Sequence, residues 1–309
     1  MDHFCQSLPK AELHLHLEGS VEPATLKDLD PDLTDAEIAA ALAYDDFAGF
    51  ISSYIWVSKR LHGPAEYALV ARRLLEKLES QTVRYAEITI SAGMVLWKKQ
   101  DFAPIYAVLS REAGRSRIKI RWILDAVRHF GAEPGMRVAE LAIERAADGV
   151  IAFGIGGDEA RGPAEWFHDV FRFARDGGLR LVCHAGETAG PESVWAALAI
   201  GAERIGHGIR SIEDPALIEH LRDKNIPLEI CILSNVRTGA VASLAAHPIR
   251  QLYDAGVPIV LNTDDPALFE TTLTGEYELA ATQFGFTHNE LADLAHNSFR
   301  YGFASPEAL

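Results

Sequence analysis

Eight short apolar segments, most of them followed by a turn and a longer helical stretch, restrict the fold of this 309-residue chain more than any other feature. The segments with strand-like patterns are Ala11–Leu17, Val83–Ser91, Ile118–Val127, Val150–Ile155, Arg180–Cys183, Arg204–Gly208, Leu228–Leu233 and Pro258–Leu261. Strands that alternate with helices predict a parallel sheet with helices outside it, and eight strands are enough to close a barrel. We therefore expect an α/β fold, a (βα)8 TIM-type barrel. A doubly wound open sheet is the alternative, but it is disfavoured because no GxGxxG sequence follows the first strand.

The connection Glu18–Ser80 is long enough to carry helices of its own, and we predict that it forms a helical lid inserted after strand one. Residues at positions i, i+3, i+4, i+7 and i+8 share one face of a helix, and here they are Phe47, Phe50, Ile51, Tyr54 and Ile55. This face either packs on the barrel as part of an outer helix or lies over the barrel mouth. No linker or low-complexity tract divides the chain, so we expect one domain over residues 1–309.

Composition and charge exclude several classes of protein. Hydrophobic residues make up 48% and charged residues 24% of the chain, which is typical of a folded protein and excludes disorder. The 29 Lys and Arg against 44 Asp and Glu give a net charge of −15. Neither nucleic acid nor a membrane is expected as a partner, because both require a basic surface. Three scattered cysteines, no signal-peptide pattern and no long apolar run predict a cytoplasmic protein that acts on a small molecule. No sequence feature specifies an oligomeric state.

Polar residues gather at the ends of four predicted strands. Strand one ends with His14 and His16, and the period-two alternation of a strand turns both side chains to one face, here the barrel interior. The other residues of this set come from strands five, six and eight, and they are His184, His207, Asp264 and Asp265. The carboxyl ends of barrel strands meet at one cavity. Two histidines on their own could be an ordinary part of the core, but six such polar residues in one cavity predict a functional site.

This set of side chains indicates a metal site. Buried carboxylates and imidazoles packed together without a cation would carry a large desolvation cost. Nitrogen and carboxylate ligands without cysteine favour zinc, although iron, cobalt and nickel accept the same ligands. Strand four ends in Gly156–Glu159 with no lysine that could bridge a second ion. The sequence therefore predicts one metal ion per chain.

Six segments together resemble the adenosine deaminase family of the amidohydrolase superfamily. They are Pro9–Ser20, Gly156–Glu159, His184–Glu187, Gly206–Gly208, Ser234–Asn235 and Asn262–Pro266. They follow the order and spacing of the family over nearly the whole chain. The resemblance implies a (βα)8 barrel with a single zinc ion held by His14, His16, His184 and Asp264.

The resemblance also implies a role for the neighbouring polar groups. Glu187 would donate a proton to N1 of a purine, and His207 would orient the attacking water and help to deprotonate it. Asp265 would bond N7, and the backbone N–H of Gly157 would face N3. These roles suit hydrolysis of an aromatic amine, which needs an activated water and a proton donor. The predicted catalytic residues are thus Glu187, His207 and Asp265, and the predicted substrate-binding residues are Gly157, Glu18, Asp265 and His16.

Glu18 distinguishes among substrates within the family. Members that act on adenosine usually carry Asp at this position, facing the ribose 5′-hydroxyl, and one more methylene moves the acid about 1.3 Å further. Glu at this position resembles the pattern of members that deaminate adenine or 6-amino-6-deoxyfutalosine. The latter is a nucleoside of menaquinone biosynthesis that carries a carboxyphenyl group at its 5′ end. The resemblance to the latter extends over Tyr44–Phe50 and Tyr54–Val57, and less firmly to Leu96-Trp97. An aromatic-rich helix suits an aryl group, whose carboxylate could use Lys59, Arg60 or another cation.

We therefore predict a zinc hydrolase that converts the 6-amino group of an adenine-ring nucleoside to a 6-oxo group, with aminodeoxyfutalosine as the favoured substrate. Adenosine and then adenine are the alternatives. Two other classes remain open. One is a metal hydrolase of the superfamily that cleaves an amide or phosphoester, against which the missing lysine and the Asp264-Asp265 pair argue. The other is a non-catalytic metal-binding or growth-factor-like protein, in which loss of the ligands or of Glu187 would be expected.

Overall fold

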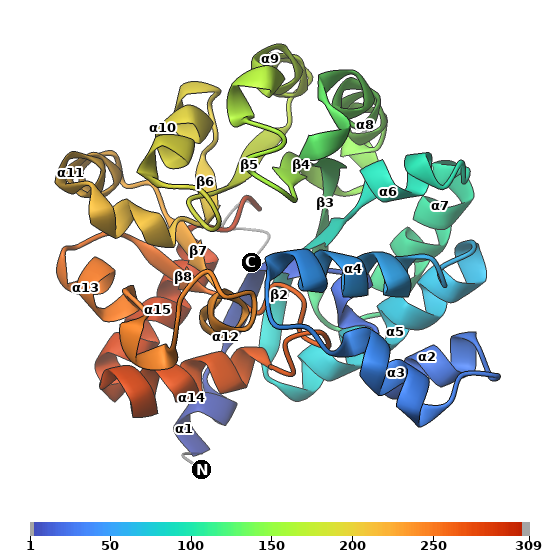
Figure 1. The fold of residues 1–309 in the computed structure, drawn as a ribbon, viewed down its shortest axis with the longest axis horizontal. Helices are drawn as coiled ribbons and strands as arrows, with labels where there is room; N and C mark the ends of the chain where they lie inside the picture. The colour runs from blue at the N-terminus through green and yellow to red at the C-terminus, as the bar shows by residue number, and fades with distance from the viewer. Residues whose placement is uncertain (1–2, 305–309) are drawn as a thin grey trace.

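The computed structural model describes residues 3–304 and confirms the barrel. Eight strands form one sheet in the order β1-β2-β3-β4-β5-β6-β7-β8, and every neighbouring pair along this order is parallel. Figure 1 shows the strands as a central ring with helices around it. The strands are β1 (Lys10–His16), β2 (Val83–Ile90), β3 (Lys119–Val127), β4 (Val150–Gly156), β5 (Arg180–Ala185), β6 (Arg204–His207), β7 (Leu228–Ile230) and β8 (Ile259–Leu261).

Helices follow the strands as the sequence pattern predicted. In the first half of the chain they are α1 (His3–Ser7), α2 (Pro23–Leu29), α3 (Asp35–Leu42), α4 (Phe47–Ser58), α5 (Pro64–Ser80), α6 (Ala92–Trp97), α7 (Phe102–Ala113) and α8 (Ala132–Glu144). In the second half they are α9 (His168–Asp176), α10 (Pro191–Ala199), α11 (Pro215–Lys224), α12 (Ile232–Arg237), α13 (Ile249–Asp254), α14 (Leu273–Phe284) and α15 (His288–Arg300). No helix among residues 3–304 has both the length and the apolar character needed to cross a bilayer.

One predicted strand is too long by three residues. Strand seven was expected over Leu228–Leu233, but it ends at Ile230 and helix α12 begins at Ile232. The Glu276 carboxylate accepts the backbone N–H groups of Ile232 (2.8 Å) and Leu233 (3.4 Å). This contact from α14 satisfies two donors at the first turn of the helix, which an apolar pattern alone does not reveal.

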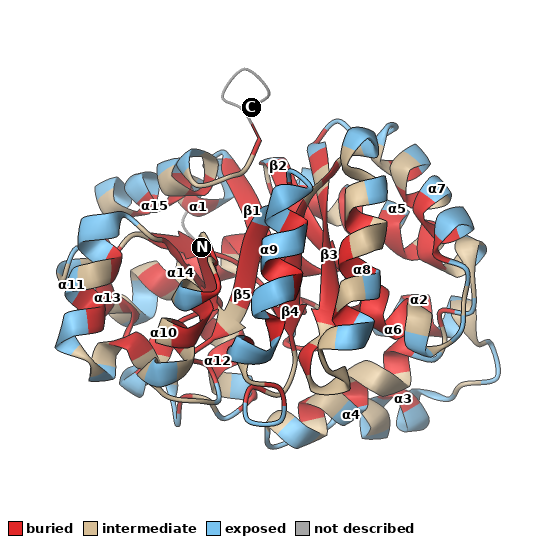
Figure 2. Ribbon diagram, turned by 90° about the horizontal axis from the view of Figure 1, so that it is seen from above, coloured by how far each residue is buried: buried red, intermediate tan, exposed pale blue. Residues whose placement is uncertain are grey.

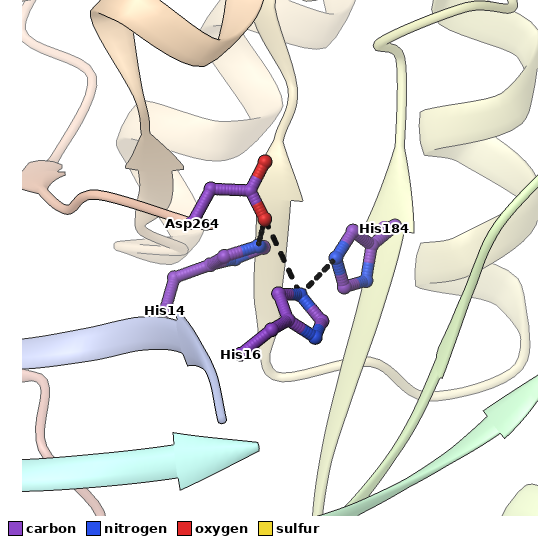
Figure 3. A group of neighbouring side chains, drawn as sticks. All are labelled: His14, His16, His184 and Asp264. Atoms are coloured by element: carbon purple, nitrogen blue, oxygen red, sulfur yellow. Dashed lines mark hydrogen bonds and ion pairs between the residues drawn. The ribbon is translucent and has the colours of Figure 1, made fainter. Parts of the chain in front are cut away.

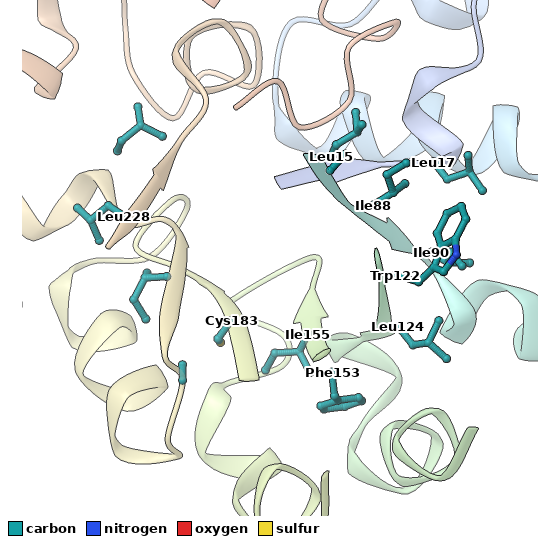
Figure 4. Packing of buried hydrophobic residues seen from close by; sticks show 14 of the residues in the cluster. Leu15, Leu17, Ile88, Ile90, Trp122, Leu124, Phe153, Ile155, Cys183 and Leu228 are labelled. Atoms are coloured by element: carbon teal, nitrogen blue, oxygen red, sulfur yellow. The ribbon is translucent and has the colours of Figure 1, made fainter. Parts of the chain in front are cut away.

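The core has an outer layer between strands and helices and a smaller interior. Figure 4 shows outward-facing strand residues of the larger cluster, among them Leu15, Ile88, Leu124, Phe153 and Cys183. Two separate small clusters fill the barrel interior, and they include Leu13, Tyr85 and Val260 in one and Ile123, Ala152 and Val182 in the other. In Figure 2 the strands are buried along their length, while the helices expose their outer faces.

An irregularity in β1 turns the predicted histidines inward. Glu12 pairs with Ala86 and Leu15 pairs with Ile88. Between these two pairs β1 advances by three residues and β2 by two, so β1 contains one extra residue. The backbone N–H groups of Leu13 (2.8 Å) and His14 (3.1 Å) both donate to the side-chain oxygen of Asn262. An extra residue reverses the alternation of a strand. Leu13 belongs to an interior cluster below the bulge, and the residues that face inward above it are His14 and His16.

The same region closes the barrel. Between β8 and β1 the described structure has one bridge, from Leu15 to Asp264. The Asp264 backbone donates to the His14 carbonyl at 2.9 Å, and the His16 backbone donates to the Asp264 carbonyl at 2.8 Å. Residues that carry the predicted chemistry therefore also hold the last strand against the first.

Candidate active site

A cavity opens at the carboxyl ends of the strands, where the sequence placed the site. Its empty space is about 860 Å³, part of which is open to solvent. Its lining combines the predicted polar residues with an aromatic wall from helix α4. The polar residues are His16, His184, Glu187, His207, Asp264 and Asp265, and the α4 residues are Phe47, Phe50, Ile51, Tyr54 and Ile55.

Four predicted metal ligands come together. One ligand atom from each of His14, His16, His184 and Asp264 lies within 4.8 Å of the others. Figure 3 shows the four side chains converging on one point. The Asp264 Oδ1 atom is 3.4 Å from His14 Nε2 and 3.3 Å from His16 Nε2. The His16 and His184 Nε2 atoms are 3.2 Å apart. The donors come from β1, from β5 and from the residues after β8, so the barrel assembles them from both ends and from the middle of the chain.

Outer hydrogen bonds orient two of these imidazoles for a cation. His14 Nδ1 lies 2.8 Å from the Glu229 carboxylate, and His184 Nδ1 lies 3.0 Å from the Ile155 carbonyl. Both partners only accept, so each Nδ1 carries the proton and each Nε2 presents a lone pair to the cluster. His14 Nε2 is buried and has no hydrogen-bond partner among residues 3–304. Converging lone pairs and a carboxylate are the donor set that a divalent metal accepts.

Without a cation, the pKa values of the cluster residues are shifted strongly and in opposite directions. Burial lowers the pKa of His14, but the nearby carboxylates of Asp264 and Glu229 outweigh it and raise the pKa to about 10. Without a cation His14 Nε2 is therefore protonated, and a bound metal would replace that proton. Burial lowers the pKa of His16 to about 4 and that of His184 well below its usual value. Burial would raise the pKa of Asp264, but the neighbouring imidazoles of His14, His207 and His16 hold that pKa far below its ordinary value. The carboxylate therefore stays ionised among imidazoles, which is the state that binds metal.

Glu187 and His207 lie beside this cluster. His207 Nε2 is 3.8 Å from the Glu187 carboxylate and 3.9 Å from Asp264 Oδ2. Burial raises the pKa of Glu187 well above its usual range, and the charges of Asp264 and Glu159 raise it further. A carboxyl group that keeps its proton near neutral pH is suited to donate it.

Glu159 holds the loop that carries Glu187. Its carboxylate accepts backbone N–H groups from Gly186 (2.8 Å), Glu187 (2.9 Å) and Thr188 (2.7 Å), and it also bonds the Ser193 hydroxyl. Burial would raise the pKa of Glu159, but these hydrogen bonds and Arg128 lower it. Glu159 is therefore an ionised anchor for the loop after β5.

The structure also places the predicted purine contacts on the cavity wall. Asp265 is buried, and burial together with the charge of Asp264 raises its pKa well above the usual value. Its Oδ1 atom has no hydrogen-bond partner among residues 3–304. A Cβ atom on Gly19 would lie 1.6 Å from that oxygen, so only glycine permits this approach. Gly157 lines the cavity with a φ of +96°, a conformation that glycine adopts without strain.

The backbone is strained at two of these positions. His207 (φ +61°) and Asp264 (φ +63°) both adopt the left-handed conformation although neither is glycine. Such conformations cost free energy and persist where the surrounding structure imposes them, often at functional sites. In Asp264 the backbone bonds to β1 supply that constraint.

Glu18 does not line the cavity. Its side chain is fully buried, and its carboxylate accepts the Ser91 backbone N–H (3.2 Å) and the Tyr54 hydroxyl (3.3 Å). Tyr54 and Ser91 are the residues that face the cavity at this point. The structure thus places Glu18 behind the cavity wall, where it joins α4 to the end of β2.

Neither cation considered for a substrate carboxylate faces the cavity. The Arg60 guanidinium stacks on the Trp56 ring at 3.5 Å and lies 3.4 Å from Asp30. Within residues 3–304 no lysine or arginine side chain lines the cavity, and Lys59 is exposed. The mouth instead carries Trp97, which is 52% exposed and stacks with Phe130 at 6.3 Å.

Sequence reasoning missed several residues that support the site. Glu229 orients His14, Glu159 holds the Glu187 loop, and Asn262 forms the bulge of β1. Asp125 was also missed: it lines the cavity, and burial raises its pKa to about 8. A charged residue inside a strand-like apolar run, as Glu229 and Asp125 are, is the signal that could have identified two of them.

Comparison with known proteins agrees with this geometry. The family model described as "Adenosine deaminase" matches residues 9–308. The chain is 37% identical to the aminodeoxyfutalosine deaminase of Streptomyces coelicolor, over 97% of this chain and 81% of that protein. It is 36% identical to the adenine deaminase of Rhizobium johnstonii, over 97% of this chain and 96% of that protein.

A solved structure gives the same fold. An amidohydrolase from Burkholderia ambifaria with bound Zn is 27% identical and superposes with a TM-score of 0.91, covering 99% of this chain and 88% of that chain. The barrel, the His/Asp cluster and the match over residues 9–308 agree with one another. The chain belongs to the adenosine deaminase family of metal-dependent hydrolases.

Proposed function

We propose that this enzyme replaces the 6-amino group of an adenine-ring nucleoside by a 6-oxo group and releases ammonia, with one zinc ion per chain. The observation that carries the proposal is the cluster of His14, His16, His184 and Asp264 at the floor of a cavity that also presents Glu187 and Asp265. These four residues would hold the zinc. When bound, the ion would act as a Lewis acid that activates a water molecule for attack at C6.

The surrounding side chains have protonation states that suit this reaction. Glu187, kept neutral by burial and by neighbouring carboxylates, would donate its proton to N1 of the ring as the amine carbon is attacked. Asp265, also neutral, would donate a hydrogen bond to N7. The Gly157 N–H would donate to N3. Contacts to N1, N7 and N3 would together recognise the adenine ring.

The favoured substrate is 6-amino-6-deoxyfutalosine. The cavity continues past the polar cluster to an aromatic mouth formed by α4, Trp97 and Phe130, and an aryl group at the 5′ end of the nucleoside would bury its surface there. Covering ~80 Å² of apolar surface stabilises a complex by about 2 kcal/mol, roughly thirtyfold in affinity. The similarity to the Streptomyces coelicolor deaminase supports the same choice.

Adenine is the second candidate. The adenine deaminase of Rhizobium johnstonii is nearly as similar to this chain as the first relative. The burial of Glu18 behind Tyr54 removes the one carboxylate expected at the ribose. Adenine would, however, leave the aromatic mouth without a contact.

Metal content tests the first part of the proposal. Elemental analysis of protein purified without added metal should give about one zinc per chain. A reproducible ratio near two, or a different ion that alone supports activity, would contradict the single-zinc proposal.

A panel of 6-aminopurines tests the second part. We expect kcat/KM for aminodeoxyfutalosine to exceed that for adenosine and that for adenine by at least about tenfold each. The ultraviolet change from 6-amino to 6-oxo purine measures the rate, and ammonia release confirms it. Equal or faster turnover of adenosine or adenine would refute the favoured substrate and leave the deamination chemistry in place.

A further inference from the structure

We propose that Asn235 and His247 are positioning residues that hold His207 in one tautomer, with the proton on Nε2. His207 then presents an N–H to the cavity and donates a hydrogen bond there. The proposal rests on the proposed deamination for its catalytic meaning, and it rests on hydrogen-bond geometry for the tautomer itself.

A chain of three hydrogen bonds carries the inference. The backbone N–H of Ile249 donates to His247 Nδ1 at 3.2 Å. His247 Nε2 lies 3.1 Å from the Asn235 side-chain oxygen, and the Asn235 side-chain nitrogen lies 3.0 Å from His207 Nδ1. The far end of the chain, His207 Nε2, faces Glu187 and Asp264.

The backbone group determines the direction of every bond. An amide N–H can only donate, so His247 Nδ1 must accept, and a neutral His247 then carries its proton on Nε2. That proton is donated to the Asn235 oxygen. The Asn235 NH2 group is then left to donate to His207 Nδ1, which must accept, and the proton of a neutral His207 lies on Nε2.

The opposite orientation of the Asn235 amide is excluded. A reversed amide would direct its NH2 group at His247 Nε2, which would have to accept. His247 would then carry its proton on Nδ1, where it would meet the Ile249 N–H donor to donor. The conflict would lie in a buried region, where unsatisfied donors are costly. The assignment therefore follows from the Ile249 backbone and not from the amide position alone.

The residues that form these hydrogen bonds are buried, so solvent offers them no alternative partners. Asn235 is fully buried on α12, and His247 is 4% exposed in the segment before α13. The His247 ring meets Phe284 of α14 edge-on at 5.8 Å. Burial lowers the pKa of His247 to about 4, so it stays neutral at neutral pH. No water is needed to complete any of the three bonds.

The consequence differs from the role first expected for His207. A histidine with its proton on the cavity side cannot accept a proton from water at that nitrogen. It can donate a hydrogen bond to the attacking oxygen and stabilise negative charge that develops on it. The chain through Asn235 thus assigns His207 to orientation and charge stabilisation.

Nitrogen-15 NMR of the zinc-loaded enzyme with labelled histidine tests the tautomer directly. His207→Gln identifies the His207 signals. We expect the His207 Nδ1 signal of an unprotonated nitrogen and the Nε2 signal of a protonated one. A protonated Nδ1 in the unsubstituted enzyme would overturn the proposal without any variant having to fold.

Three variants test the positioning role. In Asn235→Asp the new carboxylate can only accept, so His207 Nδ1 should gain a proton, and kcat should fall by about 10²–10⁴ as expected for a wrong tautomer, with a smaller change in KM. His247→Ala should give mixed His207 tautomers, whereas His247→Gln, which can still donate to Asn235, should restore the original spectrum. An unchanged spectrum and an unchanged kcat in Asn235→Asp and His247→Ala would contradict the role.

The spectrum separates this inference from the proposed function. If no 6-aminopurine is deaminated but the expected tautomer is seen, the proposed function fails and the hydrogen-bond chain stands. If deamination proceeds with His207 protonated on Nδ1, the proposed function stands and the inferred direction of the hydrogen bonds is wrong.

Discussion

Individual residues of the site are paired with partners that fix their protons or positions. Glu229 orients His14, the Ile155 carbonyl orients His184, and Glu159 holds the loop of Glu187. Substitution of such partners typically costs about 10–100-fold in metal affinity or activity. Two predictions follow for single side chains, one for the proton donor and one for its anchor.

Glu187→Gln should keep the metal and most substrate binding but lose kcat by at least ~10²–10⁴, because an amide cannot supply the proton. Zinc content by elemental analysis and steady-state kinetics measure the two effects. His14→Ala is the matched comparison and should lose metal as well as activity. Loss of zinc in Glu187→Gln with retention in His14→Ala would show that the roles have been assigned to the wrong residues.

Glu159→Gln should destabilise the protein by about 2 kcal/mol at neutral pH, since an ionised acceptor of several N–H groups is replaced by an amide. The pKa of Glu159 is lowered in the folded state, so its stabilisation is present above the unfolded pKa near 4.3 and is lost as pH falls through the folded value. The stability difference between wild type and variant should therefore shrink below about pH 4.

Thermal and denaturant unfolding at several pH values measure this difference. Glu165→Gln, the same substitution at an exposed position of the same connection, should change stability little at any pH. A Glu159→Gln difference that grows toward acid pH would contradict the assignment of an ionised anchor.

Among the elements, helix α4 determines the shape of the cavity. Its amphipathic pattern predicted one apolar face, and all five residues of that face line the cavity. Asp46 caps the helix by accepting the Gly49 N–H at 2.8 Å, and Glu18 ties its middle to the barrel through Tyr54. The helix is thus a wall of the cavity, and the movement of a lid stays a prediction.

Glu18→Asp should weaken this tie, because the carboxylate withdraws by about 1.3 Å from Tyr54 and Ser91. We expect the preference for aminodeoxyfutalosine over adenosine to shrink by about fivefold, equivalent to the ~1 kcal/mol of one hydrogen bond. Tyr54→Phe should act in the same direction, since it removes only the hydroxyl. The ratio of kcat/KM values for the two nucleosides is the measurement.

Ser52→Ala on the exposed face of α4 is the control and should leave the ratio unchanged. If Glu18→Asp alters the ratio but Tyr54→Phe does not, Glu18 acts on the substrate itself and not through the helix.

At the scale of the whole molecule, barrel closure and site assembly are one event. The bridge between Leu15 and Asp264, the bulge of β1 and the side chain of Asn262 join the two ends of the sheet and position His14, His16 and Asp264 together. Losing closure should therefore cost both stability and metal.

Asn262→Ala removes the acceptor of two buried backbone N–H groups. An unsatisfied buried donor costs about 1–3 kcal/mol, so we expect the free energy of unfolding to fall by about 2–5 kcal/mol and zinc content to fall with it. Thermal unfolding and elemental analysis measure both. Asn289→Ala, on the exposed surface of α15, is the control. Full zinc content at wild-type stability would show that closure does not depend on Asn262.

The local pattern of the sequence was sufficient for the barrel and for the side chains that gather at its mouth. Alternating strands and helices predicted all eight strands, and polar residues at strand ends predicted the set of side chains that meet in one cavity, because the carboxyl ends of parallel strands must meet. Both inferences depend on periodicity and chain order, which are local properties. The choice of four of them as metal ligands came from the family resemblance. The largest boundary error, at Ile230, lies where Glu276 of a distant helix caps α12.

Only the tertiary structure decided which way these side chains face and which partners hold them. His14 meets Glu229 across 215 residues, and Leu13 meets Asn262 across 249. The alternation of β1 made His14 and His16 share a face, but the bulge decided that this face is the interior. The sequence predicted Glu18 as a substrate contact, but in the structure it lies behind Tyr54. The reason is that helix α4 lies over the strand ends and forms the cavity wall at this point. Contacts of such separation depend on how elements pack in space, and no periodicity within one element encodes them.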